Sequence, residues 1–215
     1  MSKQNEDVIF NYWETFVKKA SKPIQDWLRQ ESIFLKKNIT KNSIVLDVGA
    51  GYGRNVLDIA KIAKKIIGID KSKFIIDATS KIAKKYKNVE FYCQDALKIN
   101  YPNNSFDYVL CLGNTFGNLD KDKISLLKEM ERVCKKGGKI YICVYSDKAL
   151  TIRLKEYKKI GIHIKKIKGG IVYNDSGQLS EQFSKTQLKR LFKKVGLEAN
   201  IIELTSISYM CVAIK

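Results

Sequence analysis

The sequence is poor in the residue types that build metal centres and catalytic triads. It contains a single histidine, His163, and its five cysteines form no Cys-x-x-Cys pair. A zinc centre needs several closely spaced cysteine or histidine ligands, and a Ser-His-Asp triad needs a histidine in a suitable local context. We therefore expect no metal site. Because most of the cysteines lie in apolar stretches, we expect buried free thiols in a reducing compartment.

Long apolar segments are also absent. The longer apolar runs, such as Ile140–Tyr145, are far shorter than the roughly 18 residues that a membrane-spanning helix requires. Residues 1–7 are polar and of mixed charge, without the apolar segment of a secretory signal. Only two prolines occur, and no Gly/Ser-rich linker divides the 215 residues. We expect one globular cytoplasmic domain with no membrane partner.

Arginine is scarce although the chain is strongly basic. The net charge is +18, from 40 lysines and arginines against 22 acids, but only five of the basic residues are arginines. Nucleic-acid recognition through base edges and bidentate phosphate contacts favours arginine. Lysine pairs spread along the chain are typical of solvated helix faces. The densest basic cluster, Arg153–Lys168, contains a single acid, Glu156, and leaves a nucleic-acid partner open but not favoured.

Hydrophobic periodicity predicts an α/β fold. Apolar residues at helical spacing occupy two N-terminal stretches, 8–17 and 24–35, and from residue 43 short β-branched runs alternate with amphipathic stretches. This alternation is typical of βαβ units in a mostly parallel sheet with helices on both faces. The last two runs, 200–205 and 208–214, are joined by a tight connection and predict an antiparallel pair.

One segment interrupts the alternation. Within residues 149–183, Gly169-Gly170 precedes an extended run, a turn signal at Asp175-Ser176-Gly177 and a second extended run, which predict a β-hairpin insertion or lid. A helix follows, with Ser184 as its cap and Gly196 at its end. We divide the single domain 1–215 into an N-terminal helical cover, a ligand-binding core, the insertion, and a C-terminal helix with a strand pair, at residues 1–42, 43–148, 149–183 and 184–215.

The most informative segment runs from Val45 to Arg54 as Val-Leu-Asp-Val-Gly-Ala-Gly-Tyr-Gly-Arg. A buried strand, a glycine turn and a helix start in this order bring backbone N–H groups close to a ligand. A dinucleotide fingerprint would require glycine in place of Arg54. The carboxylate of Asp47 disfavours a pyrophosphate and suits an ammonium group. The segment therefore predicts a partly cationic ligand.

Two further acids follow the next two predicted strands. Asp70 can accept hydrogen bonds from both hydroxyls of a ribose. Asp95 can accept one from an exocyclic amine such as that of adenine. Either acid alone could be a helix N-cap. Together with Asp47 they would meet at the carboxyl-end edge of the sheet, where open α/β sheets bind ligands.

These residues resemble the class I S-adenosylmethionine-dependent methyltransferases. Val45–Gly53 is similar to the first motif of that family, Asp70 to its ribose-binding acid and Asp95 to its adenine-contacting acid. The resemblance implies S-adenosyl-L-methionine as cofactor and a Rossmann-like, seven-stranded, mostly parallel sheet with an antiparallel last strand. The cofactor contacts that it implies are Tyr12, Asp47, Gly49, Ala50, Gly51, Arg54, Asp70, Lys71, Asp95, Ala96, Leu112 and Gly113.

The loop after the predicted fourth strand, Leu112–Leu119, is where such enzymes meet cofactor and substrate. It lacks the Asn-Pro-Pro-Tyr type of signature used on nucleobase or amide nitrogens, and it is similar to the loop of glycine and sarcosine N-methyltransferases. A purely structural Gly/Asn turn is the alternative. Asn114 is the resulting acceptor-side candidate, and Tyr145 and Tyr173 are candidates for freeing an amine lone pair, although both tyrosines could serve packing alone.

Three functions remain open at this point. The first is transfer of a methyl group to a small-molecule acceptor, an amine or carboxylate metabolite, under a lid formed by the N-terminal helices and the insertion. The second is methylation of RNA or protein, with the basic insertion as a docking surface. The third is a non-catalytic module that binds the cofactor. A sulfonium already supplies the leaving group, so alignment and removal of water suffice without a general base.

Overall fold

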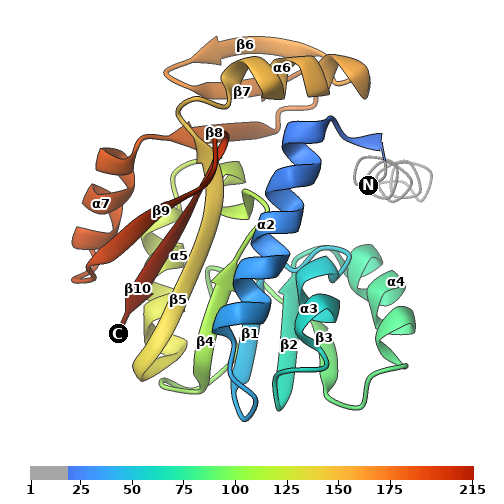
Figure 1. The fold of residues 1–215 in the computed structure, drawn as a ribbon, viewed down its shortest axis with the longest axis vertical. Helices are drawn as coiled ribbons and strands as arrows, with labels where there is room; N and C mark the ends of the chain where they lie inside the picture. The colour runs from blue at the N-terminus through green and yellow to red at the C-terminus, as the bar shows by residue number, and fades with distance from the viewer. Residues whose placement is uncertain (1–18) are drawn as a thin grey trace.

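The structure is a computed structural model that describes residues 19–215 (Figure 1), and all structural statements refer to these residues. At its centre five parallel strands lie in the order β3-β2-β1-β4-β5. The strands are β1 (Ile44–Val48), β2 (Lys65–Asp70), β3 (Val89–Cys93), β4 (Phe106–Cys111) and β5 (Cys134–Ser146). The strand order reverses at β1, which has β2 on one side and β4 on the other. Ligands of open α/β sheets bind at the carboxyl-end edge beside such a reversal.

Two C-terminal strands extend this sheet. β10 (Ser208–Ile214) lies antiparallel between β5 and β9 (Ala199–Thr205). The two-residue connection between β9 and β10 is too short for the crossover that parallel strands need. The two strands therefore pair antiparallel. The predicted seven-stranded, mostly parallel sheet with an antiparallel last strand is confirmed as the series β3-β2-β1-β4-β5-β10-β9.

Helices cover both faces of the sheet, as the alternation predicts. Those that pack on it are α2 (Lys22–Asn38), α3 (Arg54–Ile59), α4 (Lys73–Ala83), α5 (Lys123–Val133) and α7 (Lys185–Lys193). In the hydrophobic core, α2, α3 and α4 share a cluster with Val45, and α5 and α7 share a second cluster with Leu46. Neighbouring residues of β1 enter different clusters because side chains alternate along a strand. The crevice edge therefore lies between two layers of helices.

The insertion adds three strands and one helix at the end of β5. They are α6 (Leu150–Lys159), β6 (Ile164–Lys168), β7 (Ile171–Asn174) and β8 (Leu179–Phe183). The predicted hairpin is β7–β8, and β6, which the sequence did not reveal, pairs antiparallel with β7. Its Ile-Lys-Lys-Ile-Lys sequence lacks the period-two alternation of a half-buried strand. The end of β8 pairs parallel with β5 through Tyr145–Gln182 and Ser146–Phe183, so the insertion continues the main sheet.

The helix signals read from the sequence are found where they can be checked. α2 carries Pro23 in its first turn. α7 begins after Ser184, whose hydroxyl accepts from the Gln187 N–H in a capping box. The predicted helix at 8–17, and with it Tyr12, lies outside the described residues.

The cysteines are free thiols, four of them buried as expected and one, Cys93, exposed. Within residues 19–215, no group of three or more histidine, cysteine, aspartate or glutamate side chains could hold a metal ion. In the same part of the chain, no helix combines the length and the apolar character needed to cross a membrane.

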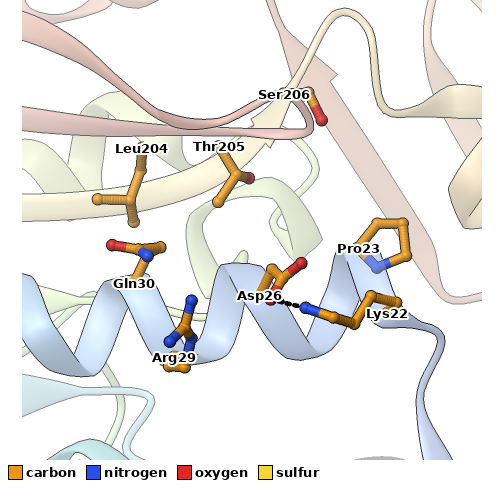
Figure 2. A pocket seen from close by; sticks show the side chains of 8 residues that line it. All are labelled: Lys22, Pro23, Asp26, Arg29, Gln30, Leu204, Thr205 and Ser206. Atoms are coloured by element: carbon orange, nitrogen blue, oxygen red, sulfur yellow. Dashed lines mark hydrogen bonds and ion pairs between the residues drawn. The ribbon is translucent and has the colours of Figure 1, made fainter.

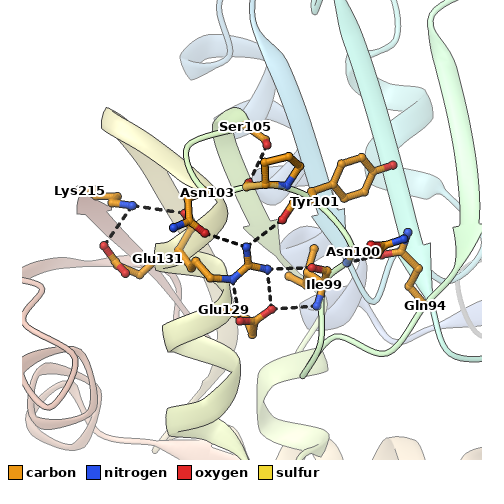
Figure 3. Close-up of polar contacts among 11 residues, drawn as sticks. Gln94, Ile99, Asn100, Tyr101, Asn103, Ser105, Glu129, Glu131 and Lys215 are labelled. Carbon is orange, nitrogen blue, oxygen red and sulfur yellow. Dashed lines mark hydrogen bonds and ion pairs between the residues drawn. The ribbon is translucent and has the colours of Figure 1, made fainter.

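Arg132, near the end of α5, holds the long loop between β3 and β4. Figure 3 shows Ile99 and Tyr101 of this loop close to Glu129 of α5. The guanidinium of Arg132 donates to Glu129 and to the backbone carbonyls of Ile99 and Tyr101, each at 2.8 Å. Glu129 also accepts from the Ile99 N–H at 2.8 Å. Charged hydrogen bonds of this kind reinforce one another. The cluster fixes the course of the loop that contains Asp95.

Candidate active site

The glycine turn after β1 is fastened to the strand beside it. The N–H groups of Gly49 and Ala50 donate to the Ile69 carbonyl at 2.8 and 2.9 Å. Gly49 adopts a φ of +70°, and a Cβ on it would lie 2.3 Å from Cγ2 of Thr115. Only glycine accommodates both the left-handed backbone and this close approach. The turn therefore packs directly against the loop that follows β4.

Asp70 joins the glycine turn from the end of β2. One carboxylate oxygen accepts from the Gly51 N–H at 3.2 Å, and the other accepts from the Ser72 N–H at 3.0 Å. A carboxylate offers about four acceptor positions, so capacity for two further hydrogen bonds remains. Asp70 is partly exposed and can present this capacity to a ligand.

Asp95 lies on the same edge, one strand further out. Its Oδ1 accepts from the Leu97 N–H at 2.9 Å, a local turn contact, and its side chain is exposed. Ala96 beside it is partly buried, and Lys71, which follows Asp70, is exposed. Because β2 and β3 pair in register from Ile66 to Asp70, these residues lie at the ends of adjacent strands, on the same edge of the sheet.

Asp47 is a buried carboxyl at the base of the turn. The residue is only 2% exposed, and its Oδ2 atom has no hydrogen-bond partner within the described part of the chain. Burial, assisted by the nearby carboxylates of Glu31 and Asp70 and opposed by Arg54, raises the pKa of Asp47 to about 8. The buried Oδ2 atom can accept a hydrogen bond from a positively charged group.

Glu31 of α2 is a buried site residue that sequence reasoning missed. One of its carboxylate oxygens accepts from the Gly113 N–H at 3.1 Å, and the other forms an ion pair with Arg54. Arg54 also donates to the Leu28 carbonyl at 3.4 Å. These contacts tie α2 to the glycine turn and to the loop after β4. Glu31 lies seven residues after the buried Ile24, so a charge on the apolar stripe of α2 was the available signal.

Asn114 is a junction between three elements. It is buried with a φ of +66°, Oδ1 accepts from the Tyr145 N–H at 3.1 Å, and Nδ2 donates to Ser180 Oγ at 3.0 Å and Asn118 Oδ1 at 3.3 Å. Leu112, two residues earlier, is buried as well. Both amide hydrogens of Asn114 are thus already donated. The contacts join the loop after β4 to β5 and β8.

The two candidate tyrosines occupy different places. Tyr145, at the end of β5, is buried, and its ring centroid lies 4.6 Å from that of Trp27 in α2. Tyr173, in β7, is partly exposed, and Lys166 Nζ lies 4.6 Å from its ring centroid. Tyr173 pairs with Leu179 at the far end of β8 from the pairs with β5. The structure brings Tyr145 next to Asn114 and leaves Tyr173 in the outer part of the insertion.

A groove of about 520 Å³ lies between α2 and the end of β9. Figure 2 shows Asp26, Arg29 and Gln30 of α2 facing the connection between β9 and β10. Its lining consists of Lys22, Pro23, Asp26, Arg29, Gln30, Leu204, Thr205 and Ser206. None of the predicted cofactor or acceptor residues between 19 and 215 lines this groove.

Comparison with known proteins identifies the family of the chain. A family described as a methyltransferase domain matches residues 39–196. Demethylmenaquinone methyltransferase of Bacillus licheniformis is 33% identical over 110 residues, which are 50% of this chain and 46% of that protein. A probable ribosomal RNA small subunit methyltransferase A of Methanosphaera stadtmanae is 40% identical over 75 residues, 34% of this chain and 27% of that protein. The chain therefore spans about half or less of the length of these two relatives.

A solved structure shows the same fold over nearly the whole chain. The 1,6-didemethyltoxoflavin-N1-methyltransferase of Burkholderia thailandensis, with bound 1,6-didemethyltoxoflavin and S-adenosylhomocysteine, has a TM-score of 0.70 at 14% identity. The match covers 99% of this chain and 89% of that one.

Proposed function

Since this chain belongs to the methyltransferase domain family, we propose that it uses S-adenosylmethionine to methylate a small molecule bearing an amine or a carboxylate. The observation that carries the acceptor class is the way the insertion closes the end of β5. Tyr145 and Asn114 are both buried beneath it, and β8 is hydrogen-bonded to β5 at this point. A site covered in this way favours a small molecule over a polymer as the acceptor.

The residues at the glycine turn fit the cofactor. Asp47 provides a buried carboxylate oxygen without a partner, which suits an ammonium group. Asp70 retains acceptor capacity for ribose hydroxyls, and Asp95 is exposed at the next strand end for an exocyclic amine. When bound, S-adenosylmethionine supplies a methyl group on a sulfonium that is its own leaving group.

The acceptor side of the proposal rests on the loop after β4 and on the insertion. Asn114 acts as a positioning residue, because its amide holds the Tyr145 backbone and the Ser180 hydroxyl. Tyr145 forms an aromatic wall, and residues 149–183 serve as the lid that excludes water from the acceptor. Alignment and desolvation are then the main contributions of the protein, and no general base is needed.

Calorimetric titration with S-adenosylmethionine and S-adenosylhomocysteine tests the cofactor assignment. Asp70→Asn keeps the side-chain shape and removes the charge, so the dissociation constant should rise about 10- to 150-fold, from a lost charged hydrogen bond worth about 1.5–3 kcal/mol. Asp175→Asn, which removes an exposed carboxyl from the hairpin turn, is the matched control. Unchanged affinity in Asp70→Asn would contradict its ribose role, and no binding by the wild type would contradict the whole proposal.

A transfer assay with methyl-labelled cofactor tests the acceptor class. The enzyme is incubated with a mixture of small amines and carboxylic acids, and in parallel with total RNA and with a protein mixture. We expect label in the low-molecular-mass fraction. Label found only in RNA or protein would overturn the small-molecule assignment.

One observation favours RNA or an acidic protein as a second candidate acceptor. Lysines of α6 and β6 are exposed on the insertion, and the acid among them, Glu156, is buried. The six exposed lysines are Lys155, Lys158, Lys159, Lys165, Lys166 and Lys168. If these lysines bind a polyanion, the logarithm of the association constant for RNA should fall steeply and linearly with the logarithm of the salt concentration. A flat plot would leave these lysines as a solvated surface.

A further inference from the structure

Arg153 of α6 is a fully buried cation with unusual partners. Its Nη1 donates to the Gly170 carbonyl at 3.2 Å and to Gln182 Oε1 at 3.0 Å, and its Nη2 donates to the Ser180 carbonyl. All three acceptors are neutral. Nε has no hydrogen-bond partner among residues 19–215. Of the five N–H groups of the guanidinium, the Nε–H and one N–H on Nη2 therefore remain unused.

Glu156 of α6 and Glu181 of β8 belong to the elements that surround Arg153, but both have other partners. Glu156, one turn further along α6, accepts from the Ser21 N–H at 3.1 and 3.2 Å and lies 3.9 Å from Lys159 Nζ. Glu181, in β8, forms an ion pair with Lys123 at 2.7 Å. No carboxylate of the described residues forms an ion pair with Arg153. A buried guanidinium without an anionic partner is unfavourable, and an anionic ligand would relieve this.

Arg153 lies beside the residues that the proposed function assigns to the methyl acceptor. Its Cζ lies 4.8 Å from the ring centroid of Tyr145. It is also connected to Asn114 through Ser180, whose carbonyl accepts from Arg153 and whose hydroxyl accepts from Asn114. The unpaired cation is therefore adjacent to the residues assigned above to the acceptor.

We propose that Arg153 binds a carboxylate of the methyl acceptor through its Nε–H and the unused N–H of Nη2. This inference rests on the proposed function and narrows the acceptor to a metabolite that carries a carboxylate. A planar carboxylate matches two neighbouring N–H groups of a guanidinium, a geometry that lysine cannot offer. Because Arg153 is fully buried in this structure, the carboxylate reaches it only when the insertion opens.

Trp27 provides the readout. Its ring packs on Tyr145, the ring that faces Arg153. The chain has two tryptophans, so Trp13→Phe leaves Trp27 as the sole tryptophan. In this background, with selective excitation of tryptophan over the tyrosines, we titrate acetate as the probe, with acetamide as a neutral analogue of the same shape and potassium chloride as the ionic-strength control. We expect a saturable change with acetate and none with the two controls.

The test of the assignment is Arg153→Lys in the same background. Lysine keeps the positive charge and loses the paired N–H groups, so the acetate dissociation constant should rise at least about tenfold, the effect of a lost charged hydrogen bond. Equal acetate affinity in both proteins, or no acetate response in the Arg153-containing protein, would overturn the proposal. Circular dichroism and the melting temperature show whether the Arg153→Lys protein is folded.

A second measurement keeps the proposal testable if Arg153→Lys does not fold. The protein has five arginines, so a ¹⁵N–¹H spectrum of arginine Nε groups contains at most five cross-peaks. The Arg153 Nε–H is buried and should give the cross-peak that exchanges slowest with water. Acetate, but not acetamide, should shift this cross-peak. A cross-peak that does not move with acetate would overturn the assignment.

Failure of this inference and failure of the proposed function have different signatures. Acetate binding requires neither cofactor nor transfer. If acetate does not bind but labelled methyl still reaches small molecules, the role of Arg153 is wrong and the function stands. If acetate binds but no small molecule is methylated, the anion site stands and the function is wrong.

Discussion

Removal of the Asp47 carboxyl should stabilise the protein, and by an amount that depends on pH. The pKa of this carboxyl is raised from an ordinary value of 3.8 to about 8 in the folded state, chiefly because it is buried and secondarily because Glu31 lies near. Between these two pH values the folded chain holds a proton that the unfolded chain has lost. Stability therefore falls as pH rises through this window and levels off above about pH 8.

The size of the effect follows from the same linkage. Each pH unit within the window changes the free energy of unfolding by about 1.4 kcal/mol, so the wild type should lose about 3 kcal/mol between pH 5 and pH 7 through Asp47 alone. Asp47→Asn is neutral at every pH and escapes this loss. The stability advantage of Asp47→Asn over the wild type should accordingly grow by about 3 kcal/mol over the same interval.

Urea denaturation of both proteins at a series of pH values from about 5 to 9 measures the difference. Asp175→Asn, which removes an exposed carboxyl, controls for the loss of a carboxyl as such. The same Asp47→Asn protein should bind S-adenosylmethionine more weakly, because the ammonium group of the cofactor would lose the carboxylate proposed to bind it. A difference in stability that is constant with pH would refute the reasoning, since it would mean that Asp47 ionises equally in both states.

Three further predictions concern the framework of the site. Gly49→Ala should destabilise the protein by about 2 kcal/mol or more, because its Cβ would meet Thr115 at 2.3 Å on a left-handed backbone; an unchanged urea midpoint would contradict this. Arg132→Met should cost about 1–2 kcal/mol, because the partly exposed Glu129 loses its ion pair and the Ile99 and Tyr101 carbonyls lose a charged donor. It should also speed hydrogen exchange in the loop after β3, and unaltered exchange there would contradict its role. Ser184→Ala should lower stability by about 1 kcal/mol through loss of the α7 cap, measured by thermal melting, and no change would argue against the capping box.

Local patterns in the sequence predict much of the fold and of the cofactor edge. The alternation of strands and helices, the glycine turn and the acids at strand ends depend on neighbours within a few residues, which a sequence displays directly. The strand β6 escaped because its lysines mask any alternation. Glu31 and Arg153 escaped for a different reason: their roles arise from contacts with Gly113 and Gly170, which only the folded chain brings near.

The short junction between β8 and β5 has a consequence for how acceptor preference can change. Two backbone pairs, at Tyr145 and Ser146, join β8 to β5. Side-chain contacts of Ser180 with Asn114 and of Glu181 with Lys123 join β8 to the loop after β4 and to α5. The glycine turn and the acids that follow β1, β2 and β3 lie outside this segment. We therefore expect that residues 149–183 could be exchanged between relatives, with the backbone pairs and the contacts of Ser180 and Glu181 kept. Such an exchange would change the acceptor and leave the residues proposed for the methyl donor unaltered.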